Sequence, residues 1–128
     1  MAPPQIPAQV LRFLEECIDS VPQLEALLIM LDEPARFWTS IEMGARIYVS
    51  ESEASRVLDR LARRELIEAD DAGNRYRIQA ADGAKSALIE EVARTYRENL
   101  TRIATFIHEK PPASVKEFAR AFDLKKDP

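Results

Sequence analysis

Arginines and serines at helical spacing between residues 52 and 63 are the side chains best suited to do chemistry in this sequence. At 100° per residue, one side of a helix here collects the apolar residues Ala54, Val57, Leu58 and Leu61. The opposite side collects Ser52, Ser55, Arg56, Asp59, Arg60 and Arg63. Arginine donates two hydrogen bonds at once to guanine or phosphate, and serine bonds phosphates or base edges. This face predicts a helix that enters the major groove of double-stranded DNA, although such a face alone is more often a solvated surface.

Two further groups of residues could hold the phosphate backbone beside that groove. Arg75 and Arg77 are two residues apart on an expected strand, so both side chains project from the same face. Thr39 and Ser40 stand at an expected helix start, where free backbone N–H groups attract an anion. Together with the helix, these residues favour DNA binding over a merely solvated surface.

Catalytic, metal and cofactor chemistry find little support in the sequence. Adjacent acids such as Glu15-Glu16 point about 100° apart on a helix, so we interpret them as solvated surface. Cys17 and His108, the single cysteine and the single histidine, are too few for an ordinary zinc site. The three glycines build no phosphate-binding loop. We therefore expect no enzyme activity, no metal and no cofactor.

The composition sets the class of protein. The 128 residues carry 18 basic and 22 acidic side chains, a net charge of -4, with 46% hydrophobic residues. These values are typical of one globular domain. No apolar run is long enough to cross a bilayer and the start lacks signal-peptide features, so we expect a cytoplasmic protein without membrane contact. Residues 1–35 hold one arginine against six acids, whereas residues 53–64 hold four arginines against two acids, so the acidity lies away from the expected reading helix.

Helices and one hairpin are expected to position these side chains. A proline-rich, disordered leader over residues 1–7 precedes a first helix over residues 8–19. A capping box at Ser20 starts a second helix that runs to about Leu31. Phe37-Trp38 is expected to be a short strand.

The next segments are shorter and closely linked. A capping box at Thr39 opens a short helix to about Ile47, and another at Ser50 opens a helix that ends near Arg64. Residues 67–78 alternate apolar and polar side chains around a turn rich in Asp, Gly and Asn, which predicts a β-hairpin with one buried face.

Four stretches follow one another as a helix, a capped short helix, an arginine-bearing helix and a wing: LEALLIML, TSIEMGARI, SESEASRVLDRLARRELIEAD and NRYRI. Through them, residues 21–78 resemble the winged-helix domains of bacterial transcription regulators in the broad MarR-like and PadR-like group. The resemblance implies a mainly α winged helix-turn-helix with a small β-hairpin wing. It also implies operator binding as a homodimer, with the recognition helix at residues 53–64 and with Arg75 and Arg77 in the wing on the backbone. The acidic tip Asp70-Asp71 departs from the basic wings of that group.

Residues 82–109 are expected to form one uninterrupted helix, roughly 40 Å long at about 1.5 Å per residue. A heptad seam runs along it: Ile89, Val92, Tyr96, Asn99, Ile103 and Phe106, widened by Leu100. We interpret this seam as the interface of a two-fold homodimer, with Asn99 helping to set the register. The alternative is that the seam packs against its own chain.

The chain is thus divided into the leader (1–7), a first helix with the winged-helix domain (8–80), a long C-terminal dimerisation helix (81–110), and a short amphipathic helix with a tail (111–128). The favoured function is a sequence-specific DNA-binding transcriptional regulator. The alternative is a winged-helix module that binds another protein through Phe118 and Phe122 and does not contact DNA. A third hypothesis is control by a small ligand near Trp38, Tyr96 or Phe106.

Overall fold

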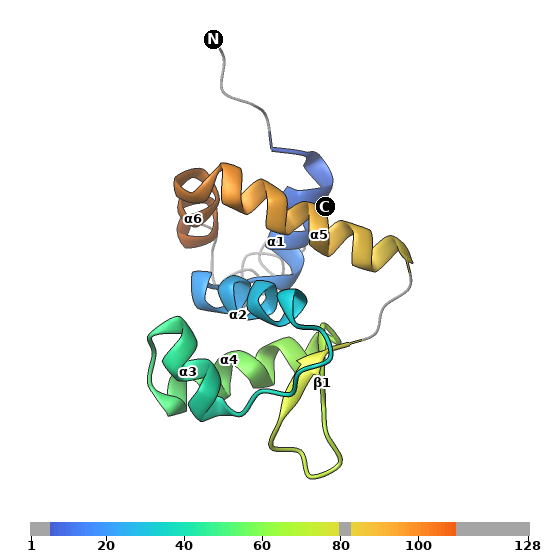
Figure 1. Cartoon of the computed structure of the whole chain (residues 1–128). Coiled ribbons are helices and arrows are strands. Elements are labelled where there is room, and N and C mark those ends of the chain that lie inside the picture. The colour runs from blue at the N-terminus through green and yellow to red at the C-terminus, as the bar shows by residue number, and fades with distance from the viewer. Residues whose placement is uncertain (1–5, 80–82, 110–128) are drawn as a thin grey trace, which may run out of the picture.

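The structure is a computed structural model that describes residues 6–79 and 83–109. Its elements are α1 (Ala8–Cys17), α2 (Val21–Asp32), α3 (Ser40–Ile47), α4 (Glu51–Arg63), β1 (Ile67–Ala69), β2 (Tyr76–Ile78), α5 (Gly83–Glu98) and α6 (Leu100–Glu109). Figure 1 shows α1, α5 and α6 on one side of α2, and α3, α4 and the hairpin on the other. The predicted mainly α fold with a small β-hairpin is confirmed.

Helix α2 is central because its residues are apolar on more than one side. Its buried side chains include Leu24, Ala26, Leu27, Leu28 and Met30, and it contacts α3, α4, β2 and α6. The Ser20 hydroxyl caps the helix by accepting the Gln23 N–H at 3.4 Å. The Gln23 side chain accepts from the Asp19 N–H at 2.9 Å and not from Ser20, so the predicted capping box forms in one direction only.

The turn between α3 and α4 is tight, and glycine makes it possible. A Cβ on Gly44 would lie 2.9 Å from the Val49 carbonyl oxygen, closer than a real Cβ can approach backbone. Tyr48 ends α3 in the left-handed conformation with φ of 60°, and its side chain is 93% exposed. Ser50 then caps α4 by accepting the Glu53 N–H at 3.1 Å. The turn therefore fixes the direction in which α4 leaves α3.

Helix α4 and the hairpin follow the predicted patterns closely. The core face of α4 is confirmed: Ala54, Val57, Leu58 and Leu61 are buried. Strands β1 and β2 pair antiparallel, with Ile67 opposite Ile78 and both buried. Trp38 pairs with Tyr76 through an isolated antiparallel bridge, so the strand predicted at Phe37-Trp38 is present at Trp38 alone.

The prediction of one uninterrupted C-terminal helix is wrong, because the helix breaks at Asn99. The Asn99 side-chain amide donates to the Thr95 carbonyl at 3.0 Å, and the Asn99 N–H donates to the Tyr96 carbonyl at 3.2 Å. Asparagine side chains compete in this way for the backbone groups that would continue a helix. Helix α6 starts at Leu100 and runs at a steep angle to α5 (Figure 1).

Most of the predicted heptad seam packs against its own chain. Ile89, Val92, Tyr96 and Ile103 belong to the hydrophobic core of the chain, each at most 9% exposed. In α6, Ile103 and Ile107 are buried, and the helix contacts α2. Packing against the own chain therefore accounts for these four seam residues. Among the described residues, no helix is both long and apolar enough to span a membrane.

Candidate nucleic-acid interface

The outer face of α4 presents the side chains that the helical spacing assigned to it. Ser52, Ser55, Arg56, Arg60 and Arg63 are all exposed. The apolar residues beneath them anchor the helix against α2 and α3. The structure thus presents these five side chains together on the exposed side of one helix, where they could contact a large partner.

Each arginine of this face already has a carboxylate partner. Arg56 Nη2 lies 2.7 Å from Glu53 Oε2, and Arg63 Nε lies 2.9 Å from Asp59 Oδ2. Both pairs span one helical turn between exposed side chains. Such pairs stabilise a helix by about 0–1 kcal/mol, because water and salt screen them. A phosphate or a guanine can therefore displace the carboxylate at little cost.

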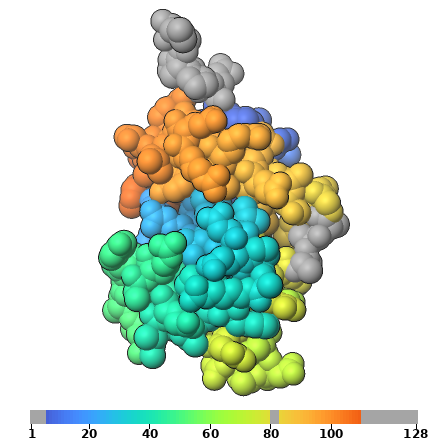
Figure 2. Space-filling model, viewed as in Figure 1, coloured from blue at the N-terminus to red at the C-terminus, as the bar shows by residue number. Residues whose placement is uncertain are grey.

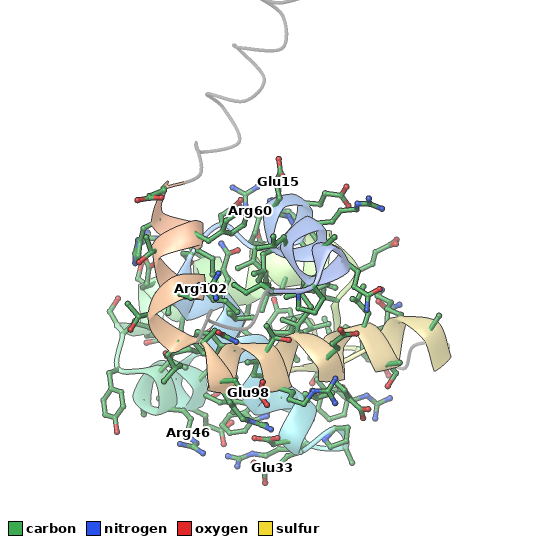
Figure 3. The ribbon with its side chains drawn as sticks, turned by 90° about the horizontal axis from the view of Figure 1, so that it is seen from above. Glu15, Glu33, Arg46, Arg60, Glu98 and Arg102 are labelled. Carbon is green, nitrogen blue, oxygen red and sulfur yellow. The ribbon has the colours of Figure 1, made fainter. Side chains whose placement is uncertain are left out.

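Arg60 differs because its partner lies outside the helix. Its Nε is 3.7 Å from Asp19 Oδ2, on the connection between α1 and α2. Arg64 lies 2.8 Å from the same carboxylate oxygen and also donates to the Cys17 carbonyl. In Figure 3 Arg60 lies toward the edge of the molecule that holds Glu15, and Arg46 lies at the opposite edge. Helical spacing gives no sign of the contact between Asp19 and Arg64, since the two residues are more than 40 positions apart in sequence.

A groove of about 460 Å³ runs between the start of α2 and this face of α4. Ser20 and Gln23 line one side, and the arginines Arg56, Arg60 and Arg63 line the other with Glu53 and Asp59 among them. Acids and bases alternate along the groove, so its charge is nearly balanced. Residues 53–64 hold four arginines against two acids, but only three of those arginines line the groove, because Arg64 pairs with Asp19 instead.

The hairpin holds Arg75 and Arg77 between carboxylates and an aromatic ring. Arg75 Nε donates to Asp70 Oδ2 at 2.9 Å, and Arg77 Nε donates to Glu68 Oε1 at 2.8 Å. Both guanidinium groups lie over the Phe37 ring, at 5.5 and 4.7 Å from its centroid. Figure 2 shows the hairpin projecting at one end of the molecule, beside the connection from α2 to α3.

Asp70, at the acidic tip of the hairpin, has a structural role in the turn. Its carboxylate accepts from the Arg75 side chain and from the backbone N–H groups of Asn74 and Arg75. The hydrogen bond from the Arg75 side chain is the largest cause that lowers the pKa of Asp70 below its ordinary value of 3.8. The acid therefore closes the turn and orients an arginine.

The helix start at Thr39 is less available to a phosphate than the sequence predicted. Thr39 Oγ1 accepts the Glu42 N–H at 3.1 Å, and the Thr39 N–H donates to Glu42 Oε1 at 3.0 Å. The backbone hydrogen bond from Thr39 is the first cause of a lowered pKa of Glu42. The capping box thus uses the donor of Thr39 and places a carboxylate at this helix start. The Thr39 N–H is therefore not a free donor. Phosphate contacts from Thr39 and Ser40 stay predictions.

The remaining sequence predictions concern a small ligand near three aromatic residues and a protein contact near the C-terminus. Trp38 is 2% exposed and Tyr96 is 9% exposed, so both are core residues, and burial is the first cause of a raised pKa of Tyr96. Phe106 lies beside a hollow of about 440 Å³ with Ile6, Leu11 and Arg102. Phe118 and Phe122 lie outside the described residues. In the described part of the chain, no cluster of His, Cys, Asp and Glu could hold a metal ion.

No protein-family model and no curated protein matches the sequence. Solved structures do share its fold. The transcriptional regulator Tm0710 from Thermotoga maritima is 15% identical with a TM-score of 0.51, over 92% of this chain and 82% of its own. RV1404 from Mycobacterium tuberculosis is 18% identical with a TM-score of 0.51, over 94% and 82%.

A third similar structure is a MepR variant from S. aureus bound to an oligodeoxyribonucleotide. It is 16% identical with a TM-score of 0.50, over 92% of this chain and 84% of its own. At these identities the likeness concerns the fold alone. It confirms the winged helix-turn-helix that the sequence predicted.

Proposed function

We propose that the chain is a MarR-like transcriptional regulator that reads double-stranded DNA with α4 and holds the DNA backbone with the hairpin. One observation carries this proposal: the exposed arginines of α4 and the two hairpin arginines belong to the same half of the molecule (Figure 1). A helix in the major groove, flanked by cationic contacts to phosphate, is a common geometry for reading DNA.

Two of the similar structures support the proposed role, one as a transcriptional regulator and one as a complex with DNA. Tm0710 is a transcriptional regulator, and the MepR variant holds an oligodeoxyribonucleotide. This chain aligns with more than four fifths of each. The proposed role needs no catalytic step, metal or cofactor, and places the protein in the cytoplasm with the DNA.

The ion pairs of α4 define how the proposed contact would form. Arg56 and Arg63 are about three quarters exposed, at 71% and 74%, so they can leave their carboxylates for DNA. Glu53 and Asp59 stay near the DNA and oppose its phosphates. We therefore expect weak binding to arbitrary sequences, and specific sites in which base contacts compensate for this repulsion.

We further propose that the regulator binds a palindromic site as a homodimer. Most of the predicted seam is buried in its own chain, which leaves other residues for the contact. Leu100 is 54% exposed, and Phe106 is half-buried beside the hollow that Ile6 and Leu11 line. The exposure of these residues supports a proposed contact through α6 and the N-terminal segment. Equilibrium sedimentation tests it, and a monomer at micromolar concentration would overturn it.

Binding of the full chain to a mixed-sequence duplex across a series of salt concentrations tests the DNA proposal. We expect weak binding that falls steeply as salt rises, because bound arginines release counterions from DNA. The variant Arg56→Gln/Arg63→Gln should bind more weakly and with a smaller salt slope. Arg94→Gln is the matched control, since Arg94 is exposed on α5 in the opposite layer.

Absence of binding at low salt would overturn the DNA proposal. It would favour the alternative module that binds a protein through Phe118 and Phe122. If the wild type binds, selection of bound sequences from a random DNA pool identifies the operator, and its symmetry tests the dimer independently.

A further inference from the structure

We propose that Phe37, on the connection between α2 and α3, is the positioning residue that directs both hairpin arginines toward DNA phosphate. The inference rests on the proposed function and deepens it. It assigns a role to an aromatic residue 38 and 40 positions before the arginines it contacts.

The ring contact is the first observation. The Arg77 guanidinium carbon lies 4.7 Å from the centroid of Phe37, and that of Arg75 lies 5.5 Å from it. Both distances fall within the range of about 6 Å in which an aromatic face attracts a cation. One half-buried ring thus contacts both cations of the hairpin.

The backbone beside the ring is held to the same hairpin. Trp38, the next residue, donates its N–H to the Tyr76 carbonyl at 2.7 Å and accepts the Tyr76 N–H at 2.9 Å. Tyr76 lies between the two arginines, and the alternation of a strand places Arg75 and Arg77 on one face. The buried Trp38 therefore fixes the ring in register with the pair.

The carboxylates leave part of each guanidinium for a ligand. Asp70 and Glu68 each accept the Nε–H of their arginine. Four of the five N–H groups of a guanidinium belong to its terminal nitrogens, which match a phosphate in a bidentate contact.

Arg36 provides an internal comparison. Its guanidinium also lies over an aromatic ring, 3.6 Å from the centroid of Trp38. Its two terminal nitrogens, however, lie 3.3 Å from Glu33 and from Glu42. Arg36 is thus held by its own chain at the atoms that would bind phosphate. The hairpin arginines, within the part of the chain that the structure describes, are held at Nε and at the ring.

Contacts that hold the two arginines in place before DNA binds reduce the side-chain entropy that they lose on binding. A free arginine side chain loses rotamer entropy when it binds, and an arginine already held by a ring and a carboxylate loses less. Loss of the ring should therefore weaken DNA binding, although Phe37 is not itself proposed to contact DNA.

A double-mutant cycle on the full chain tests the inference, with a mixed-sequence duplex at low salt as the probe. Phe37→Leu should weaken binding about three- to tenfold, since an exposed cation–π contact is weak and two are lost. Phe37→Tyr keeps an aromatic face and should restore binding to within about twofold of wild type. In the Arg75→Gln/Arg77→Gln background, Phe37→Leu should have no further effect, because the residues it positions are gone.

The outcomes separate the two proposals. A wild-type chain that binds no duplex overturns the proposed function, and the inference with it. A wild-type chain that binds while Phe37→Leu binds equally well overturns the inference alone. An equal loss on Phe37→Leu in both backgrounds also overturns it, since that result assigns Phe37 a general structural role. Circular dichroism of each variant keeps a folding defect from being read as a binding effect.

Discussion

The two arginine sets of this molecule are held in different ways. On α4, Arg56 and Arg63 pair with acids three or four residues away on the same helix. On the hairpin, Arg77 pairs with Glu68 on the opposite strand and Arg75 pairs with Asp70 across the turn, and both arginines contact a ring from the α2–α3 connection. The α4 pairs can rearrange along one exposed surface, whereas the hairpin arginines are oriented by tertiary structure. This difference suits the first set to adapt to bases and the second to hold a repetitive backbone.

The largest expected effect is a loss of sequence specificity when the α4 arginines are replaced. Arg56→Gln/Arg63→Gln should cost about 1–3 kcal/mol per residue on the selected operator and much less on mixed-sequence DNA, because base contacts carry discrimination. Binding isotherms on both duplexes measure the ratio. An equal loss on both would show that α4 contacts only phosphates.

A smaller and more uniform loss is expected from the hairpin. Arg75→Gln/Arg77→Gln should weaken binding by a similar factor on every sequence and should lower the salt slope by about one per arginine. Measurements of affinity against salt on two unrelated duplexes check this. A loss confined to the operator would contradict a backbone role for the hairpin.

The next prediction compares a partly buried ion pair, Asp19–Arg64, with an exposed ion pair, Asp59–Arg63. Asp19 and Arg64 are 24% and 19% exposed in their side chains, and Asp19 also faces Arg60. Asp19→Asn should lower the free energy of unfolding by about 1–2 kcal/mol, since it removes a partly desolvated contact to a charged group. Asp59→Asn should change it by less than about 0.5 kcal/mol. Urea denaturation measures the free energy of unfolding of both variants. Equal losses would contradict the distinction between the partly buried and the exposed ion pair.

The smallest effect concerns pH. The pKa of Asp70 is lowered in the folded protein, mainly by the Arg75 hydrogen bond, from an ordinary value of 3.8. A lowered folded-state pKa gives stability that is present above the ordinary value and is lost as pH falls through the folded-state value. Asp70→Asn should therefore lose less stability than wild type on acidification below pH 3.8. Identical acid titrations by circular dichroism would argue against this contact.

Features that depend on local spacing could be predicted from the sequence. The buried face of α4 and the turn chemistry of the hairpin follow from periodicities of neighbouring residues. The capping box at Thr39 was also predicted, but its consequence for phosphate binding was not, because the Glu42 carboxylate occupies the Thr39 donor.

Features that depend on distant partners, or on a local side-chain bond that leaves the apolar period unchanged, could not be predicted. Asn99 continues the heptad period, so periodicity gives no sign of the break that its side chain makes. Phe37 and Asp19 are unremarkable in sequence and gain their roles from residues about 40 positions away. The aromatic pair Phe37-Trp38 did indicate a strand. If that strand is placed beside the strand that carries Arg75 and Arg77, a contact between the Phe37 ring and the arginines can be expected.

The break at Asn99 has a consequence for how the protein assembles. Because α6 turns back and closes the core with Ile103 and Ile107, one chain supplies its own buried residues. Folding should then be a first-order process, and any dimer should form from monomers that are already folded. Occupancy of a two-fold DNA site would depend on the square of the free monomer concentration, so modest changes in expression would produce a sharper change in operator binding.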